Sequence, residues 1–304
     1  MRVVIRVLAV LVGLVLIAIV GLGVAVFVDR AQGGQRLALV SDTVVPGTTG
    51  PDVAAYVTRP AGPGLHPAVI MIHEFWGLRP DVAAKADLLA EQGYLVIAPD
   101  LFRGVTTDFL PSAIVNVVTS TSAAQAEDLD AVYTWLASQS DVDRQRIGVL
   151  GFCFGGGAAL RYSLTNPDLA ATVVFYGQPV TDAEQLKRLS GPVLGIFGGD
   201  DASIPQDDVR AFDAALTEAD IAHTVTVYDG QPHAFVSSVD AIRAGGAPAE
   251  AWAQMVAFLE QSLKATSAHV QTPRSVVDLR DDPWGYAFRL AWSHLFEMGP
   301  AHAH

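Results

Sequence analysis

Hydrophobic and polar positions follow two different patterns along this chain. From Val7 to Val28 the sequence runs without a single charged residue. Folded as a helix at about 1.5 Å per residue, this run is about 33 Å long, close to the hydrocarbon thickness of a bilayer, about 30 Å. The pattern predicts a transmembrane anchor over residues 7–28, preceded by a short N-terminal tail of residues 1–6.

Two other interpretations of this run are less compatible with the residues. A cleaved signal peptide would have a shorter apolar stretch and small residues at the cleavage point, whereas the run ends Phe27-Val28-Asp29-Arg30. A buried core helix would be shorter and would not stand at the terminus. Arg2 and Arg6 flank one side of the run, and Arg30 and Arg36 flank the other, so basic residues alone do not orient it. The free amine and the short tail favour an N-terminus inside, with the rest of the chain on the extracytoplasmic side.

Beyond the anchor we expect a polar linker at residues 29–37, followed by alternating strand-like and helix-like segments up to about residue 265. The apolar, β-rich runs are Ala68–His73, Tyr94–Ala98, Ile147–Gly151, Ala171–Tyr176, Val193–Phe197 and Thr224–Tyr228. The helical stretches are Asp81–Gln92, Ala123–Gln139, Gly155–Asn166, Gln206–Ala219 and Pro248–Lys264. Continuous apolar strands that alternate with helices indicate an α/β domain, here residues 38–265, with a mostly parallel sheet covered on both faces. In such sheets the chemistry lies at the carboxyl ends of the strands.

Composition removes several classes of protein. The chain has 304 residues, of which 51% are hydrophobic and 17% charged, so it is not a disordered chain. A net charge of −13 argues against a nucleic-acid partner, which requires clustered basic residues. The single cysteine excludes an intramolecular disulfide and a cysteine-based metal cluster.

That single cysteine stands in the sequence Gly151-Phe152-Cys153-Phe154-Gly155-Gly156, between a predicted strand and a predicted helix. The pattern is typical of a nucleophile elbow, in which a sharp turn needs glycine on both sides because a Cβ there would collide with neighbouring elements. The turn places the sulfur at the N-terminus of a helix, where the dipole favours the thiolate. A buried structural cysteine is the alternative, but it would not require this setting.

An elbow nucleophile is followed along the chain by an acid and then a histidine. Asp200 and Asp201 follow the predicted strand 193–197, and His233 follows the next strand. Adjacent aspartates cannot both point at one imidazole, so one of the two is a turn residue. The other histidines precede strands, lie near the first strand or fall in the tail.

Four motifs in this order resemble the dienelactone hydrolase family, a cysteine-dependent branch of the α/β-hydrolase superfamily. The resemblance covers about residues 40–265. The motifs are His73-Glu74-Phe75-Trp76-Gly77, Ala98-Pro99-Asp100-Leu101-Phe102, the elbow around Cys153, and the loops of Asp201 and His233.

The resemblance implies an α/β-hydrolase fold and roles for particular residues. The family's acid lies in a Gly-x-Asp-x-x-Val-Pro setting, which Asp201 matches and Asp200 does not. Glu74 matches a carboxylate that contacts the resting thiol and moves away when substrate arrives. The backbone N–H groups of Phe75 and Phe154 would form the oxyanion hole.

One departure bears on the substrate. Relatives that bind an anionic dienelactone use an arginine after the Pro-Asp-Leu-aromatic motif and another soon after the catalytic histidine. Arg103 is a candidate for the first, and we also take Trp76 as a candidate substrate contact. His233 is followed by Ala-Phe-Val-Ser-Ser, which contains no arginine, so an anionic dienelactone is a doubtful substrate.

These observations predict a membrane-anchored hydrolase of carboxylic esters or lactones that acts through Cys153, His233 and Asp201 and a thioester intermediate. No metal or organic cofactor is implied. The alternative is a non-catalytic α/β-hydrolase scaffold that serves as an interaction subunit of a membrane assembly.

Residues 266–304 form a separate tail. Trp284, Phe288, Trp292 and Phe296 fall at i, i+4 spacing, which predicts a short amphipathic helix over residues 283–298, capped by Asp281 or Asp282. Its aromatic face could dock onto the catalytic domain, lie on the membrane surface, or contact a protein partner or a second copy.

Overall fold

The computed structural model describes residues 2–264 and 283–296. One sheet organises the molecule, with strands in the order β1-β2-β4-β3-β5-β6-β7-β8. The strands are β1 Thr43–Val45, β2 Val53–Thr58, β3 His66–Ile72, β4 Leu95–Pro99, β5 Val142–Phe152, β6 Ala171–Phe175, β7 Val193–Gly198 and β8 His223–Tyr228. From β4 to β8 every neighbouring pair is parallel.

The parallel part confirms the α/β fold expected from the apolar runs. Strands β4, β6 and β7 are buried along their whole length, as expected for strands covered on both faces. The antiparallel pairs β1–β2 and β2–β4 at one edge were not expected. Strand β2 alternates buried and half-buried positions, and its Ala-Ala-Tyr sequence gives this alternation little hydrophobic contrast.

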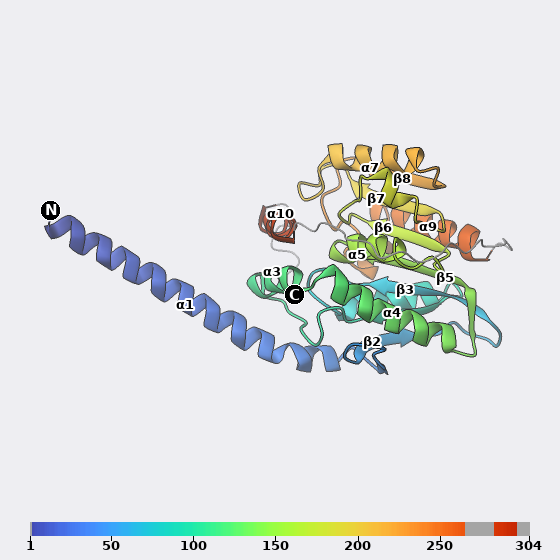
Figure 1. The fold of residues 1–304 in the computed structure, drawn as a ribbon, viewed down its shortest axis with the longest axis horizontal. Helices are drawn as coiled ribbons and strands as arrows, with labels where there is room; N and C mark the ends of the chain where they lie inside the picture. The colour runs from blue at the N-terminus through green and yellow to red at the C-terminus, as the bar shows by residue number, and fades with distance from the viewer. Residues whose placement is uncertain (1, 265–282, 297–304) are drawn as a thin grey trace.

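Helices lie on both faces of the sheet (Figure 1). They are α1 Arg2–Ala38, α2 Pro80–Ala90, α3 Leu110–Thr119, α4 Ser122–Ser138, α5 Phe154–Ser163, α6 Ala183–Leu186, α7 Gln206–Glu218, α8 Val239–Ala244, α9 Ala247–Leu259 and α10 Pro283–Phe296, and a π-helical turn at Glu260–Lys264 continues α9. Helix α4 contacts α5, whereas α8 contacts both α2 and α9.

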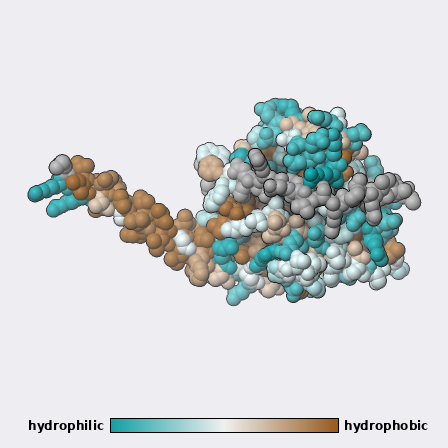
Figure 2. All heavy atoms as spheres, viewed as in Figure 1, coloured by the Kyte–Doolittle hydropathy of each residue, from teal (hydrophilic) through white to brown (hydrophobic). Residues whose placement is uncertain are grey.

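Helix α1 is long and apolar enough to cross a membrane, with a mean hydropathy of 3.1 in its most apolar window. It projects from the rest of the molecule (Figure 1), and its length between a hydrophilic tip and the body is strongly hydrophobic (Figure 2). Residues 29–37, expected as a linker, instead continue α1 as helix. Side-chain contacts account for this, because Arg36 pairs with Asp29 at 2.8 Å and donates to the carbonyl of Thr106 at 3.0 Å.

Helix α10 is present where the tail pattern predicts a helix, and it packs against α3. The face turned to the body is formed by Tyr286, Ala287, Leu290 and Ala291, which are buried. The aromatic side chains Trp284, Phe288 and Trp292 are exposed on the other face. Docking therefore uses the face opposite to the aromatic one. The predicted Asp281 or Asp282 cap and the Phe296 side chain lie outside the described residues.

Candidate active site

The elbow at Cys153 forms where β5 passes into α5. Cys153 has φ 55° and ψ −117°, a backbone conformation that L-residues rarely adopt, and its N–H donates to the carbonyl of Phe175 at 2.9 Å. The strain is typical of a functional turn. The sulfur lies at the N-terminus of α5, where unpaired backbone N–H groups and the helix dipole favour a negative charge.

Glycine on each side makes this turn possible. A Cβ on Gly151 would come within 2.0 Å of the carbonyl oxygen of Gly155, and one on Gly155 within 2.4 Å of the carbonyl oxygen of Ile72. Both obstacles are backbone atoms of the packed sheet and turn, so neither can give way. The geometry of the turn therefore requires glycine at both positions.

The loops after β7 and β8 bring Asp201 and His233 together. The Oδ2 atom of Asp201 lies 2.7 Å from Nδ1 of His233, and both side chains are buried. The other carboxylate oxygen of Asp201 accepts hydrogen bonds from the N–H groups of Ser203 at 2.7 Å and Ile204 at 3.0 Å. Asp200 is exposed. Of the two adjacent aspartates, it is Asp201 that the structure brings to the imidazole.

Burial and charge act in opposite directions on His233. Burial lowers the pKa of its imidazole, but the charges of Cys153 and Asp201 and the hydrogen bonds to both raise it, and the net result is a pKa well above the usual value. The arrangement favours the protonated form of the imidazole beside the Asp201 carboxylate. An imidazole in that position can hold a proton taken from the sulfur.

Glu74 is buried next to these groups, and its Oε1 has no hydrogen-bond partner among the described residues. Burial raises the pKa of its carboxyl, while the positive charges of Lys85, His233 and Arg79 oppose that rise. The ion pairs of Arg79 run to Asp81 at 3.7 Å and to Asp108 at 3.1 Å. Glu74 is thus a carboxyl held among the active-site residues.

Lys85 is a feature that the sequence analysis did not find. It is fully buried on α2, with Nζ 4.4 Å from the centroid of the Phe152 ring. No hydrogen-bond partner for this ammonium lies among the described residues. In the sequence it is a single lysine among apolar residues of a predicted helix. A lysine in a helix normally faces solvent, so nothing in the sequence indicated that it lies in the core.

The predicted oxyanion donors and substrate contacts have different surroundings. Phe154 is the first residue of α5, and its ring lies 4.8 Å from that of Phe102. Phe75 is buried with its ring 4.4 Å from that of Trp76. The guanidinium of Arg103 is bonded to both oxygens of Asp128, at 3.1 and 2.9 Å, so its charge is already compensated within the protein.

A second unexpected residue, Tyr286, comes from α10. Its side chain is 4% exposed, and its hydroxyl has no hydrogen-bond partner among the described residues. Burial, and to a smaller extent the charge of Cys153, raises the pKa of Tyr286 well above its usual value. The sequence could have indicated its burial, because Tyr286 and Leu290 are four residues apart and form a second apolar face of this helix.

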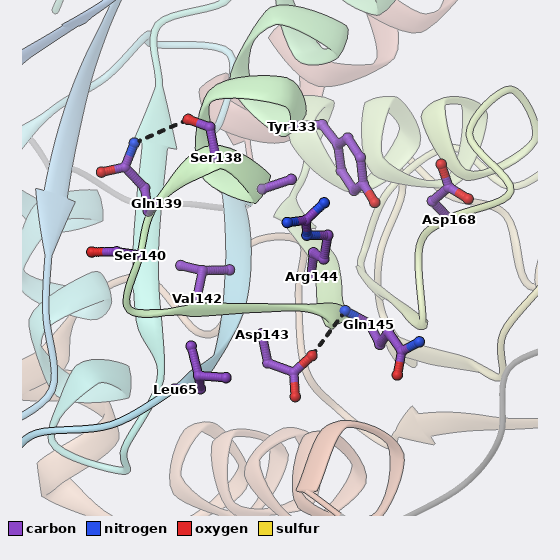
Figure 3. Close-up of a pocket in the computed structure, with 11 residues that line it drawn as sticks. Leu65, Tyr133, Ser138, Gln139, Ser140, Val142, Asp143, Arg144, Gln145 and Asp168 are labelled. Carbon is purple, nitrogen blue, oxygen red and sulfur yellow. Dashed lines mark hydrogen bonds between the residues drawn. The ribbon is translucent and has the colours of Figure 1, made fainter.

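Hollows also lie away from the catalytic residues. One of about 1000 Å³ lies around the amino end of β5 and the end of α4, and Figure 3 shows residues such as Tyr133 and Arg144 along it. Cys153 lies at the opposite, carboxyl end of β5. A smaller hollow of about 260 Å³ lies between Arg30 of α1 and Phe102, Arg103 and Asn116. Among the described residues no cluster of three His, Cys, Asp or Glu side chains could hold a metal ion.

A mostly parallel sheet, with a strained cysteine at the end of β5 and an Asp–His pair on the loops after β7 and β8, defines an α/β hydrolase. The sequence model of the dienelactone hydrolase family matches residues 53–263. The chain therefore belongs to the dienelactone hydrolase family, and its enzymatic class is that of hydrolases of ester and lactone bonds.

Individual relatives agree with this assignment. A protein of Salmonella typhimurium named "Putative carboxymethylenebutenolidase" is 36% identical over 201 residues, which are 61% of this chain and 74% of the relative. A protein of the same name from Escherichia coli K12 is 32% identical over 240 residues, 72% of this chain and 88% of the relative. The crystal structure named "Putative Dienelactone Hydrolase" from Klebsiella pneumoniae has a TM-score of 0.64 and 31% identity, and covers 72% of this chain and 97% of that chain.

Proposed function

We propose that this protein is a membrane-anchored hydrolase of carboxylic esters or lactones that acts through Cys153, His233 and Asp201. The observation that carries the proposal is the 2.7 Å contact of Asp201 with His233, beside a strained cysteine at a helix N-terminus. A buried nucleophile, acid and base, in this order along the chain, are the parts needed for acyl transfer.

The first half of the reaction forms a thioester. The Cys153 thiol gives its proton to Nε2 of His233 as the sulfur attacks the substrate carbonyl carbon. The electron pair of the carbonyl moves to its oxygen, which accepts hydrogen bonds from the N–H groups of Phe75 and Phe154. The intermediate then collapses, the C–O bond to the alcohol breaks, and the alcohol oxygen takes the proton from His233.

The second half releases the acid. Water gives a proton to His233 as its oxygen attacks the thioester carbon, and the C–S bond breaks as the sulfur recovers the proton. Asp201 keeps Nδ1 of His233 protonated throughout, so that Nε2 faces the reacting atoms. The carboxyl of Glu74, held without a partner for Oε1, contacts the resting thiol and withdraws when substrate binds. Arg103 and Trp76 remain proposed substrate contacts.

Helix α1 supplies the anchor, with the catalytic domain on the extracytoplasmic side. The support for the anchor is the apolar length of α1 and the exposure of its side chains up to Val28. Proteolysis of sealed, oriented vesicles tests the side. Protease added outside should digest the catalytic domain when the extracytoplasmic face is outermost and leave it intact in inverted vesicles, and the reverse pattern would contradict the assignment.

Our first prediction tests the catalytic assignment itself. Cys153→Ala and His233→Ala should each reduce turnover of p-nitrophenyl acetate to the uncatalysed background, because one removes the nucleophile and the other its base. Circular dichroism should show an unchanged fold. Substantial turnover in both variants would remove the assignment and favour the non-catalytic scaffold.

A further inference from the structure

Helix α10 exposes an aromatic face to solvent. Trp284, Phe288 and Trp292 are 68%, 69% and 51% exposed, although the same helix is docked firmly through its other side. Their spacing of four residues places the three rings in one stripe along the helix. Three large aromatic side chains on one exposed stripe are unusual for a surface that meets only water.

This stripe lies close to the root of α1. Helix α3 contacts both α10 and α1, and Arg30 of α1 donates a hydrogen bond to Asn116 of α3. In Figure 1, α3 and α10 form the side of the body toward which α1 runs. The two elements that expose apolar surface are therefore neighbours of the same helix.

The contacts of α1 also fix where its apolar surface ends. Exposed apolar side chains continue to Val28, and side-chain bonds to the body begin with Asp29, which accepts from Thr107. The next residue, Arg30, bonds to α3. If α1 crosses a bilayer, its water–lipid boundary lies at this level, which is the level of α3 and of its neighbour α10. Tryptophan is enriched at such boundaries because its ring is apolar and its N–H is polar.

We propose that the stripe of Trp284, Phe288 and Trp292 lies on the surface of the bilayer that α1 crosses. The inference rests on the anchoring by α1 proposed above. The molecule would then contact its membrane at two places, because α1 crosses the bilayer and the stripe lies on the bilayer surface.

The two faces of α10 then connect the membrane to the active site. The inner face is bonded to the loop of the catalytic acid, because Ser203 Oγ donates to the carbonyl of Arg289 and Arg289 Nε donates to the carbonyl of Ser203, both at 3.2 Å. The N–H of Ser203 in turn donates to Asp201. Esters that partition into the interface would therefore meet the active site at the helix that rests there.

Fluorescence quenching in vesicles tests the proposal on the full chain. The protein is reconstituted into phosphatidylcholine–phosphatidylglycerol vesicles that carry a nitroxide either at the headgroup or in the middle of the acyl chain. Helix α1 contains no tryptophan, so it does not contribute to the signal. We expect headgroup nitroxide to quench the wild type, and Trp284→Phe/Trp292→Phe to lose most of that quenching. The matched control Trp252→Phe, on buried α9, should retain it.

The outcomes separate this inference from the anchor. A chain that alkaline carbonate extracts from the vesicles would overturn both. A carbonate-resistant chain whose Trp284 and Trp292 are not quenched by headgroup nitroxide would overturn the inference alone. So would a dimer in detergent that Trp284→Ser/Phe288→Ser/Trp292→Ser dissociates and the exposed control Leu65→Ser leaves intact, because a second copy would then cover the stripe.

Discussion

At the scale of single residues, the two adjacent aspartates are a natural comparison. Asp201 is buried against His233, and Asp200 is exposed one residue away. We predict that Asp201→Asn lowers kcat by about ten-thousandfold, because an amide stabilises the wrong imidazole tautomer. Asp200→Asn should leave kcat nearly unchanged. Ester turnover of both variants measures this, and reversed effects would mean that the motif is displaced by one residue.

Glu74 provides a prediction on reactivity. A negative carboxylate beside Cys153 opposes formation of a second negative charge on the sulfur. We expect Glu74→Gln to alkylate faster with iodoacetamide near neutral pH, while its ester turnover falls or stays level. Identical alkylation curves for the variant and the wild type would show that Glu74 does not sense the thiol.

The same carboxyl provides a prediction on stability. Burial raises the pKa of Glu74 in the folded state, so the folded protein favours the neutral form and loses stability as pH rises through that pKa. Glu74→Gln, which mimics the neutral form, should therefore be more stable than the wild type at neutral pH. The difference should vanish as pH falls below the unfolded value of about 4.3. Denaturant unfolding at several pH values measures it, and a difference that grows toward acid pH would contradict the sign.

At the scale of elements, the elbow depends on backbone space. Gly151→Ala should lower the free energy of unfolding by about 3 kcal/mol or more, since its Cβ meets the backbone oxygen of Gly155. Gly157→Ala, one turn into α5, is the matched control. Its Cβ meets first the end of the flexible Arg161 side chain, at 3.1 Å, so we expect little change. Equal losses in urea unfolding would show that the turn can adapt.

The sequence predicts the elements of this fold best where periodicity is strong. The buried parallel strands and the elbow were predicted because long apolar runs and paired glycines leave few alternatives. The edge strands β1 and β2 were missed because β1 has three residues and β2 has weak contrast between its faces. The conspicuous face of α10 was mistaken for a possible docking face, because periodicity identifies a stripe without saying what it contacts.

The residues of the candidate site also divide into those that the sequence predicts and those that it does not. Cys153 and His233 lie in motifs of fixed order, so chain position locates them, and the family motif selects Asp201 over Asp200. Lys85 and Tyr286 reach the site through packing of α2 and α10, which local sequence does not encode. Residues 29–37 look like a linker by polarity, and only their bonds to Thr106 and Thr107 explain why they are helical.

At the scale of the whole molecule, α1 has two parts with different roles in stability. Removing residues 2–28 should change the Tm of the body by no more than about 2 °C, because this part makes no buried contacts. Removing residues 2–38 should lower it by about 5 °C or more, since the bonds to Thr106 and Thr107 and the burial of Leu37 are lost. Calorimetry on both truncations measures the difference, and equal Tm values would show that the root of α1 contributes nothing.

The unbroken course of α1 into the body has a consequence for how the enzyme would search for substrate. A flexible tether would let a catalytic domain sweep a hemisphere and act on anything within its reach. A helix bonded to the body at its base permits little such sweeping. If α1 crosses a bilayer, the domain would therefore hold one height and one tilt above it. Its encounters become those of lateral diffusion in a plane, with an effective concentration set by how many substrate molecules share that plane. Such an enzyme would select substrates first by their location in or on the membrane and only then by their fit to the active site.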